Sequence, residues 1–127
     1  MSKKVLLVGH CGPDSSYLRS TIKKALGDVD ILAADDSEEL SRTLHSQAID
    51  LILFNRELGY GFDPDEGVEV IRILHGTTKT KMMLVSNYPD AQQAAVAAGA
   101  LPGFGKRELG SMRVVELLRG AFESAHV

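Results

Sequence analysis

The chain has 127 residues, of which 44% are hydrophobic and 24% are charged, and its net charge is −3. The length fits one domain, residues 1–127, and the composition is that of an ordinary globular protein. The slightly acidic balance gives no reason to expect binding to nucleic acid or to an anionic membrane surface.

The apolar runs and the cysteine count indicate in which cellular compartment the protein is expected. No run approaches the roughly 20 apolar residues that span a bilayer, and Val5–Val8 is too short for the apolar region of a signal peptide. The single Cys11 cannot form an internal disulfide. We therefore expect a cytoplasmic protein that has no membrane segment.

Short apolar runs alternate with segments of helical periodicity along the chain. The runs that predict strands are Lys4–Val8, Val29–Ala33, Asp50–Phe54, Lys81–Ser86 and Leu101–Phe104. Apolar residues three or four positions apart predict helices at Asp14–Leu26, from Asp36 onward, at Val68–Leu74, from Asp90 to Gly99 and from Ser111 onward. A long loop, residues 56–67, follows the third strand.

Local signals mark where several of these helices begin and end. Asp36 and Glu39 resemble a capping box in which Asp replaces Ser or Thr. Asp90 and Ser111 are the expected N-terminal caps of the fourth and fifth helices. Glycines at positions 27 and 99 favour helix ends.

Five strands that alternate with five helices predict an α/β fold, in which a doubly wound parallel sheet carries helices on both faces. In such a sheet the loops after several strands meet at the carboxyl edge, where ligands usually bind. The residues expected at this edge are Gly9, His10, Cys11, Asn55, Ser86, Asn87 and Lys106.

These edge residues carry a resemblance to a known family. Asn55 after the third strand, VS at 85–86, GA at 99–100 and Lys106 follow the order and spacing of the receiver domain of bacterial response regulators. The resemblance covers essentially the whole chain and implies a flavodoxin-like sheet of order 2-1-3-4-5. In that family an acidic pair and a third-strand aspartate hold Mg²⁺. The aspartate takes a phosphoryl group from a histidine kinase, and a hydroxyl and a lysine bind the phosphate.

The chain departs from the family pattern at the phosphorylation site. Asn55 stands at the phosphoacceptor position, and a neutral amide cannot form the acyl phosphate. Gly9 and His10 stand at the positions of the acidic pair, so none of the three aligned side chains is a carboxylate for Mg²⁺. Ser86 and Lys106 match the family. The resemblance, with these departures, implies a degenerate receiver that has no metal, no cofactor and no catalytic residue.

A degenerate receiver is expected to signal without phosphorylation, by binding a protein such as a kinase, an output domain or another signalling protein. The face of the fourth helix, fifth strand and fifth helix, which contacts partners in the family, is the first candidate surface and could also form a homodimer. Gly103 stands where the family often has a switching aromatic residue, and Phe104 should point to the opposite face. Tyr60 and Phe62 of the long loop are a second candidate surface.

Each of these residues also has a simpler interpretation. Asn55 can satisfy local backbone groups, as Asn often does at the start of a loop. His10 can be a plain loop residue, and Lys106 can pair with Glu57 or lie in solvent. The long loop that carries Tyr60 can also pack on its own domain.

An enzyme of the same topology is the alternative. Cys11 lies between the first strand and a helix, a position at which a thiol can be activated for a small phosphatase or another thiol enzyme. In small tyrosine phosphatases an arginine follows the cysteine by six residues. Here Tyr17 has that place, Arg19 comes two residues later, and Pro13 removes a backbone amide that a phosphate would need.

Overall fold

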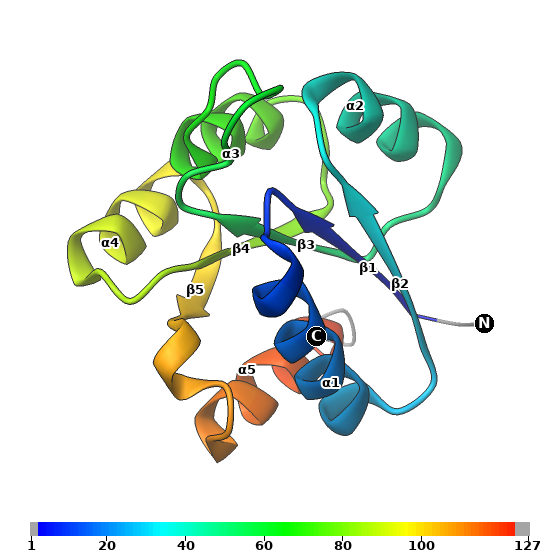
Figure 1. Cartoon of the computed structure of the whole chain (residues 1–127), viewed down its shortest axis with the longest axis vertical. Helices are drawn as coiled ribbons and strands as arrows, with labels where there is room; N and C mark the ends of the chain where they lie inside the picture. Colours follow the sequence, from blue (N-terminus) through cyan, green and yellow to red (C-terminus); the bar gives the residue numbers. More distant parts are fainter. Residues whose placement is uncertain (1–2, 124–127) are drawn as a thin grey trace.

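The protein's structure, a computed structural model that describes residues 3–123, is a five-stranded sheet with helices on both faces (Figure 1). Its strands are β1 (Lys3–Val8), β2 (Val29–Ala34), β3 (Leu51–Asn55), β4 (Lys81–Val85) and β5 (Leu101–Phe104). Its helices are α1 (Gly12–Leu26), α2 (Ser37–Ser46), α3 (Gly67–His75), α4 (Pro89–Ala98) and α5 (Met112–Glu123), and a short 3-10 turn, η1 (Lys106–Glu108), follows β5.

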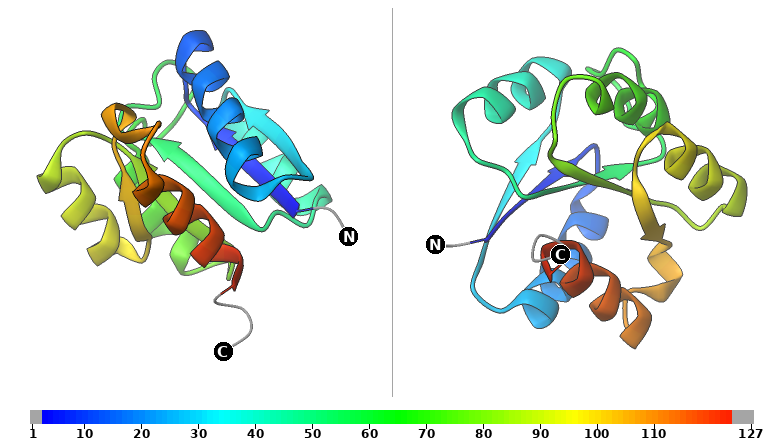
Figure 2. Two further views of the ribbon diagram at one scale, coloured as in Figure 1. Left: turned by 90° about the horizontal axis from the view of Figure 1, so that it is seen from below. Right: turned by 180° about the vertical axis from the view of Figure 1, so that it is seen from behind.

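The sheet is parallel throughout and has the order β2-β1-β3-β4-β5, which confirms the predicted fold class and topology. Alternate residues of each inner strand enter different cores. In β1, Val5 and Leu7 pack with α1 and α5, whereas Leu6 and Val8 pack on the side of α2, α3 and α4. Figure 2 (left) shows α1 and α5 side by side on their face of the sheet. Because both faces are covered, the inner strands are apolar at nearly every position.

The predicted cap at Asp36 and the predicted helix ends at two glycines are confirmed, whereas the capping box around Asp36 is incomplete. The Oδ1 of Asp36 accepts a hydrogen bond from the backbone N–H of Glu39 at 2.7 Å and so caps α2. The carboxylate of Glu39 reaches back to the N–H of Asp35 at 2.7 Å, one residue before the position that a capping box would use. Gly27 and Gly99 end α1 and α4 with φ of 74° and 118°, which favours glycine there.

Two other predicted caps are wrong. α4 begins at Pro89, and Asp90 lies within its first turn without a capping hydrogen bond. Proline suits the first helical position because its missing N–H would have no partner there. Ser111 directly precedes α5, but its Oγ is buried and has no hydrogen-bond partner among residues 3–123. No helix within that range is both long and apolar enough to cross a membrane.

Candidate functional site

Side chains from the loops after β3, β4 and β5 line a small hollow at the carboxyl edge of the sheet. The hollow has a volume of about 150 Å³ and brings Asn55, Ser86 and Lys106 together. Arg56 and Tyr88 border it, and the guanidinium of Arg56 lies over the Tyr88 ring at 4.7 Å from the ring centre. The edge therefore assembles the three side chains whose spacing resembles that of a receiver.

The amide of Asn55 ties two loops together. Its Nδ2 donates to the backbone carbonyl of Gly9 at 3.1 Å and to that of Glu57 at 2.9 Å. Carbonyl oxygens only accept hydrogen bonds, so the nitrogen of the amide must face them. A carboxylate at this position could donate to neither carbonyl and would place its negative charge against both. The simpler interpretation of Asn55, as a residue that satisfies local backbone groups, describes what its side chain does.

Lys106 is held by a carboxylate that the sequence did not single out. Its Nζ lies 2.6 Å from the Oδ2 of Asp14, in the first turn of α1. The hydrogen bond from Lys106 lowers the pKa of Asp14, so this carboxyl stays ionised. Of the two simpler alternatives for Lys106, pairing with Glu57 or lying in solvent, neither describes it, since Glu57 pairs with Arg56 at 3.0 Å. The cation at the edge is therefore largely neutralised within the chain.

Gly9 and His10, the residues that the resemblance aligns with the acidic pair, sit in tightly packed surroundings. Gly9 has φ of +76°, and a Cβ there would lie 2.7 Å from the Cδ2 and 2.9 Å from the Cα of Leu58. His10 is partly buried, and its Nε2 donates to the backbone carbonyl of Leu53 at 2.8 Å. Its Nδ1 is then the unprotonated ring nitrogen, which is buried and has no hydrogen-bond partner among the described residues. Burial lowers the pKa of His10 to about 4, so the ring is neutral near pH 7.

The donor set at this edge does not fit Mg²⁺. That ion needs hard oxygen ligands in near-octahedral geometry. The side chains at positions 9, 10 and 55 offer a hydrogen, an imidazole and an amide whose Oδ1 is a single neutral oxygen donor, so none of them supplies a carboxylate. Two carboxylates lie near these positions, and both are paired: Asp14 with Lys106, and Glu57, which lines the hollow, with Arg56. Across residues 3–123 no group of three or more His, Cys, Asp or Glu side chains could hold a metal ion.

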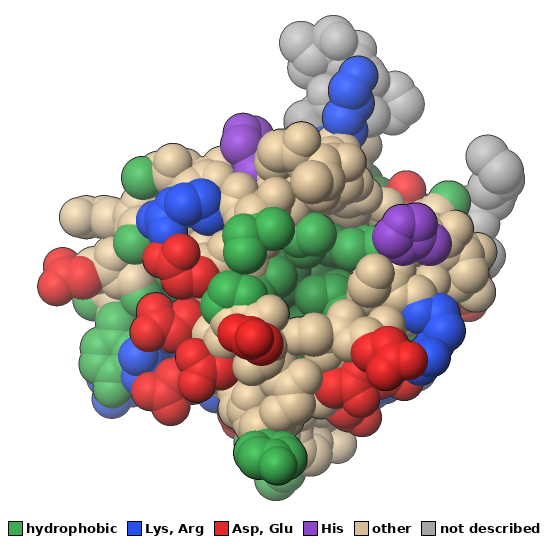
Figure 3. Space-filling model, turned by 90° about the horizontal axis from the view of Figure 1, so that it is seen from above, with side chains coloured by type: hydrophobic (Ala, Val, Ile, Leu, Met, Phe, Trp, Pro, Cys, Tyr) green, Lys and Arg blue, Asp and Glu red, His purple; other side chains and the backbone are tan. Residues whose placement is uncertain are grey.

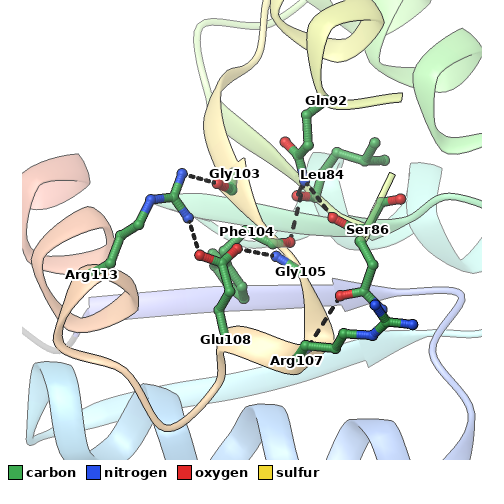
Figure 4. Close-up of polar contacts among 10 residues, drawn as sticks. Leu84, Ser86, Gln92, Gly103, Phe104, Gly105, Arg107, Glu108 and Arg113 are labelled. Carbon is green, nitrogen blue, oxygen red and sulfur yellow. Dashed lines mark hydrogen bonds and ion pairs between the residues drawn. The ribbon is translucent and has the colours of Figure 1, made fainter. Parts of the chain in front are cut away.

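A glutamine of α4 holds β4 and β5 together where their ladder is irregular. The register of the two strands shifts between Met83 and Val85. The Nε2 of Gln92 lies near this point and donates to three backbone carbonyls, those of Leu84 at 2.9 Å, Ser86 at 3.1 Å and Phe104 at 3.2 Å (Figure 4). Sequence analysis missed Gln92, because the pattern of an Ala-rich helix does not reveal which polar residue faces the sheet.

The fifth strand leaves no room for a switching aromatic residue. A Cβ at Gly103 would overlap the backbone oxygen of Leu84 and lie 2.9 Å from the Oε1 of Gln92. Phe104 points to the opposite face, where it is buried in the core that α1 and α5 cover. The space that a side chain at position 103 would need is therefore occupied by the backbone of β4 and by Gln92.

The turn after β5 is fastened from two sides (Figure 4). The Oε1 of Glu108 accepts from the N–H of Gly105 at 2.9 Å, and its Oε2 accepts from Arg113 at 2.7 Å. Arg113 also donates to the carbonyl of Gly103 at 3.2 Å. On the other side, the Oδ1 of Asn87 accepts from the N–H of Arg107 at 3.1 Å. These bonds join the β5–α5 connection to the loop after β4 and to the first turn of α5.

Comparison with known proteins supports the fold. No family model and no curated protein matches the chain. Among solved structures, the signal receiver domain of a DNA-binding response regulator from Colwellia psychrerythraea 34H is 16% identical, with a TM-score of 0.76 over 96% of this chain and 99% of that one. A response regulator receiver protein from Pseudomonas putida is 21% identical, with a TM-score of 0.72 over 94% and 97%. A response regulator from Thermotoga maritima is 21% identical, with a TM-score of 0.68 over 94% and 99%. The chain has the receiver fold.

The two aromatic residues of the long loop after β3 lie in different environments. Tyr60 is fully exposed, whereas Phe62 is buried with 7% of its surface accessible and packs in the core beside α2 and α3. The loop is joined to the start of α2, since Ser37 donates its N–H to the carbonyl of Gly61 at 3.0 Å. The expectation that Phe62 belongs to an interaction surface is therefore wrong, and Tyr60 alone remains available.

The surroundings of Cys11 do not favour the thiol-enzyme alternative. Cys11 is exposed and directly precedes α1. Arg19, the nearest arginine in sequence, is directed elsewhere, because it donates to Ser15 and to the carbonyl of Ile31, both at 3.4 Å. The carboxylate of Asp14 accepts a hydrogen bond from the thiol and would repel a phosphate there.

Proposed function

We propose that this chain is a degenerate receiver of two-component signalling that acts without phosphorylation, by binding a protein partner. The observation that carries the proposal is the double hydrogen bond of Asn55 to the carbonyls of Gly9 and Glu57. It gives the amide a structural task that a phosphoacceptor carboxylate could not perform. The position that accepts phosphate in the family is here a donor that closes the edge of the sheet.

Two further features support a role without phosphorylation. Phosphoryl transfer depends on an ion and on positive groups that neutralise the charge of the phosphate. The donor set does not fit Mg²⁺, and Lys106 is already paired with Asp14 at 2.6 Å. Gln92 and Glu108 also bond the β5 region to its neighbours, which disfavours a rearrangement of this region.

The surface proposed for a partner, or for a second copy of the chain, is the face of α4, β5 and α5. The partner would be a kinase, an output domain or another signalling protein. Val96 of α4 has 44% of its surface exposed and is an apolar contact residue available on α4. Because the bonds around β5 disfavour a rearrangement of this region, the surface would be presented constitutively rather than on activation.

The test is incubation of the purified protein with acetyl phosphate, and separately with beryllofluoride, in the presence of Mg²⁺. We expect no phosphoprotein by mass spectrometry and no change in the amide NMR spectrum. A well-characterised active receiver, treated in parallel, controls for the reagents. A stoichiometric phosphate that hydroxylamine removes would contradict the proposal, because hydroxylamine cleaves acyl phosphates.

A further inference from the structure

A second hollow, which shares no lining residue with the hollow at Asn55, lies between α2 and α3. Its volume is about 590 Å³, and apolar side chains from both helices line it, among them Leu40 and Leu44 from α2 and Val70, Ile73 and Leu74 from α3. Figure 3 views the molecule from above, the side on which α2 and α3 lie in Figure 1, and shows hydrophobic side chains in a hollow at the centre of that face. We call this hollow the α2–α3 groove.

The groove exists because α2 and α3 do not close on each other. α3 packs against α4 and α1 packs against α5, whereas the main contacts of α2 are with β2. Ile73 keeps 55% of its surface exposed as a result, and Leu44 and Leu74 are only partly buried. Exposed apolar area of this kind, continuous with the core, is characteristic of surfaces that bind partners.

The surroundings of the groove are strongly acidic. The two segments that form the groove, residues 35–45 and 63–78, contain eight of the chain's 17 acidic residues and only two of its 14 basic residues. In Figure 3, acidic side chains gather on both sides of the lower end of the hollow. Two carboxylates of these segments have an arginine partner: Glu38 pairs with Arg42, and Glu69 with Arg72.

The remaining carboxylates near the groove carry unbalanced charge. Asp35, Asp63, Asp65 and Glu66 are exposed, and none of them forms a salt bridge within residues 3–123. Asp63 also lines the groove itself. The occupant that fits must therefore offer apolar side chains to the floor and positive charge to the rim.

We propose that the α2–α3 groove binds a cationic amphipathic helix of a partner protein. Helices of nine and ten residues border the groove, which gives it a length of roughly 15 Å at 1.5 Å per residue. That length accommodates about three turns of a partner helix, whose apolar residues at i, i+3, i+4 and i+7 would enter it. Lysines or arginines on the flanks of that helix would face Asp63 and Asp65.

The charge of the rim argues against the other classes of occupant. Nucleic acids and anionic membranes carry negative charge at their surfaces, so these carboxylates repel them. The inference rests on the proposed function only in requiring a protein partner. Its outcome is separable from the phosphorylation test, because the groove shares no lining residue with the hollow at Asn55.

The experiment is an NMR titration of the isotope-labelled protein with a designed helical peptide of about 14 residues, with Leu at i, i+3, i+4 and i+7 and Lys elsewhere. A control peptide replaces every Lys with Glu. We expect the Lys peptide to shift amide signals of α2 and α3 and the Glu peptide to shift none. Added salt should weaken the binding of the Lys peptide, because salt screens the attraction between exposed charges.

Two variants distinguish binding in the groove from non-specific charge attraction. Ile73→Glu adds negative charge, which would strengthen a non-specific attraction, but it also removes an apolar contact from the groove. We expect it to weaken binding about tenfold or more. The control Met112→Glu makes the same charge change at a residue that is 65% exposed on α5, and it should leave the affinity within about twofold.

Three results would overturn the proposal. The first is binding of the Lys peptide to the Ile73→Glu variant as tightly as to the unaltered protein, or signal changes spread over the whole surface, since either indicates charge attraction alone. The second is equal binding of the Glu peptide. The third is self-association of the protein that Ile73→Glu abolishes, because the occupant would then be a second copy of this chain.

Discussion

At the carboxyl edge of the sheet, most polar side chains have partners within the chain: Asn55 bonds two carbonyls and Lys106 bonds Asp14. In the α2–α3 groove, Ile73 faces solvent and the carboxylate of Asp63 has no salt bridge among the described residues. In the first region Asn55 and Lys106 use their hydrogen bonds to hold loops and helices together. The second retains apolar area and charge that a partner could cover. Substitutions at the edge should therefore reduce stability, whereas substitutions in the groove should reduce binding.

The largest effect is expected from Gly9→Asp. The residue has φ of +76° and its Cβ would meet Leu58, so strain and overlap together should lower the free energy of unfolding by about 4 kcal/mol. Urea denaturation measures this change. Gly12→Asp is the matched control, because a Cβ at Gly12 meets nothing within 4 Å and stability should change by less than about 1 kcal/mol. Equal stability of the two variants would show that position 9 could have kept a carboxylate.

Removal of the glutamine that joins β4 and β5 should have the next largest effect. Gln92→Leu leaves the carbonyl of Leu84 without its side-chain donor and loses the bonds to Ser86 and Phe104, at a cost of about 2 to 3 kcal/mol. The neighbouring Gln93 is exposed, so Gln93→Leu should be close to neutral. Denaturation of both variants would decide whether Gln92 fastens this half of the sheet, and equal stabilities would refute it.

The burial of His10 should make the stability of the protein depend on pH. Its pKa falls to about 4 in the folded protein, from an ordinary value near 6.5 in the unfolded chain, so the neutral ring contributes stability above pH 6.5. That contribution is lost as the pH falls from about 6.5 to about 4, because the unfolded state takes up the proton first. Between pH 7 and pH 4.5 the unaltered protein should lose about 2 kcal/mol more than His10→Gln. Parallel losses in both proteins would mean that His10 is not buried as a neutral ring.

The smallest effect is expected in the groove. Ile73 is 55% exposed, so Ile73→Glu should change the free energy of unfolding by less than about 0.5 kcal/mol while it weakens peptide binding. Thermal or urea denaturation of the variant prepared for the titration gives the answer. A loss of stability as large as that of Gln92→Leu would erase the distinction between the two regions.

The fold was predictable because its signals are local. The apolar runs indicated five strands, and Gly27, Gly99 and Asp36 marked helix ends within one or two residues of the observed ones. The predictions that named a single capping side chain for α4 and α5 were wrong. Asp90 and Ser111 do not cap their helices, since backbone geometry and packing decide which side chain reaches a free N–H.

The site was predictable as a location but not as a set of contacts. Asn55 and Lys106 could be placed at one edge because parallel strands end together. That Asp14 pairs with Lys106 depends on how the first turn of α1 faces the end of β5, which spacing does not reveal. The burial of Phe62 beside the exposed Tyr60 likewise depends on the path of a loop rich in glycine.

The central claim is that position 55 needs a hydrogen-bond donor and can no longer serve as a phosphoacceptor. The most direct test compares Asn55→Asp with Asn87→Asp by urea denaturation, with and without Mg²⁺ and acetyl phosphate. Asn87 uses its Oδ1 to accept from Arg107, which a carboxylate can also do, so that variant should be nearly neutral. Asn55→Asp should lose about 2 kcal/mol, gain no stability from Mg²⁺ and take up no phosphate. Recovery of stability with Mg²⁺, or a phosphate on the new aspartate, would contradict the account.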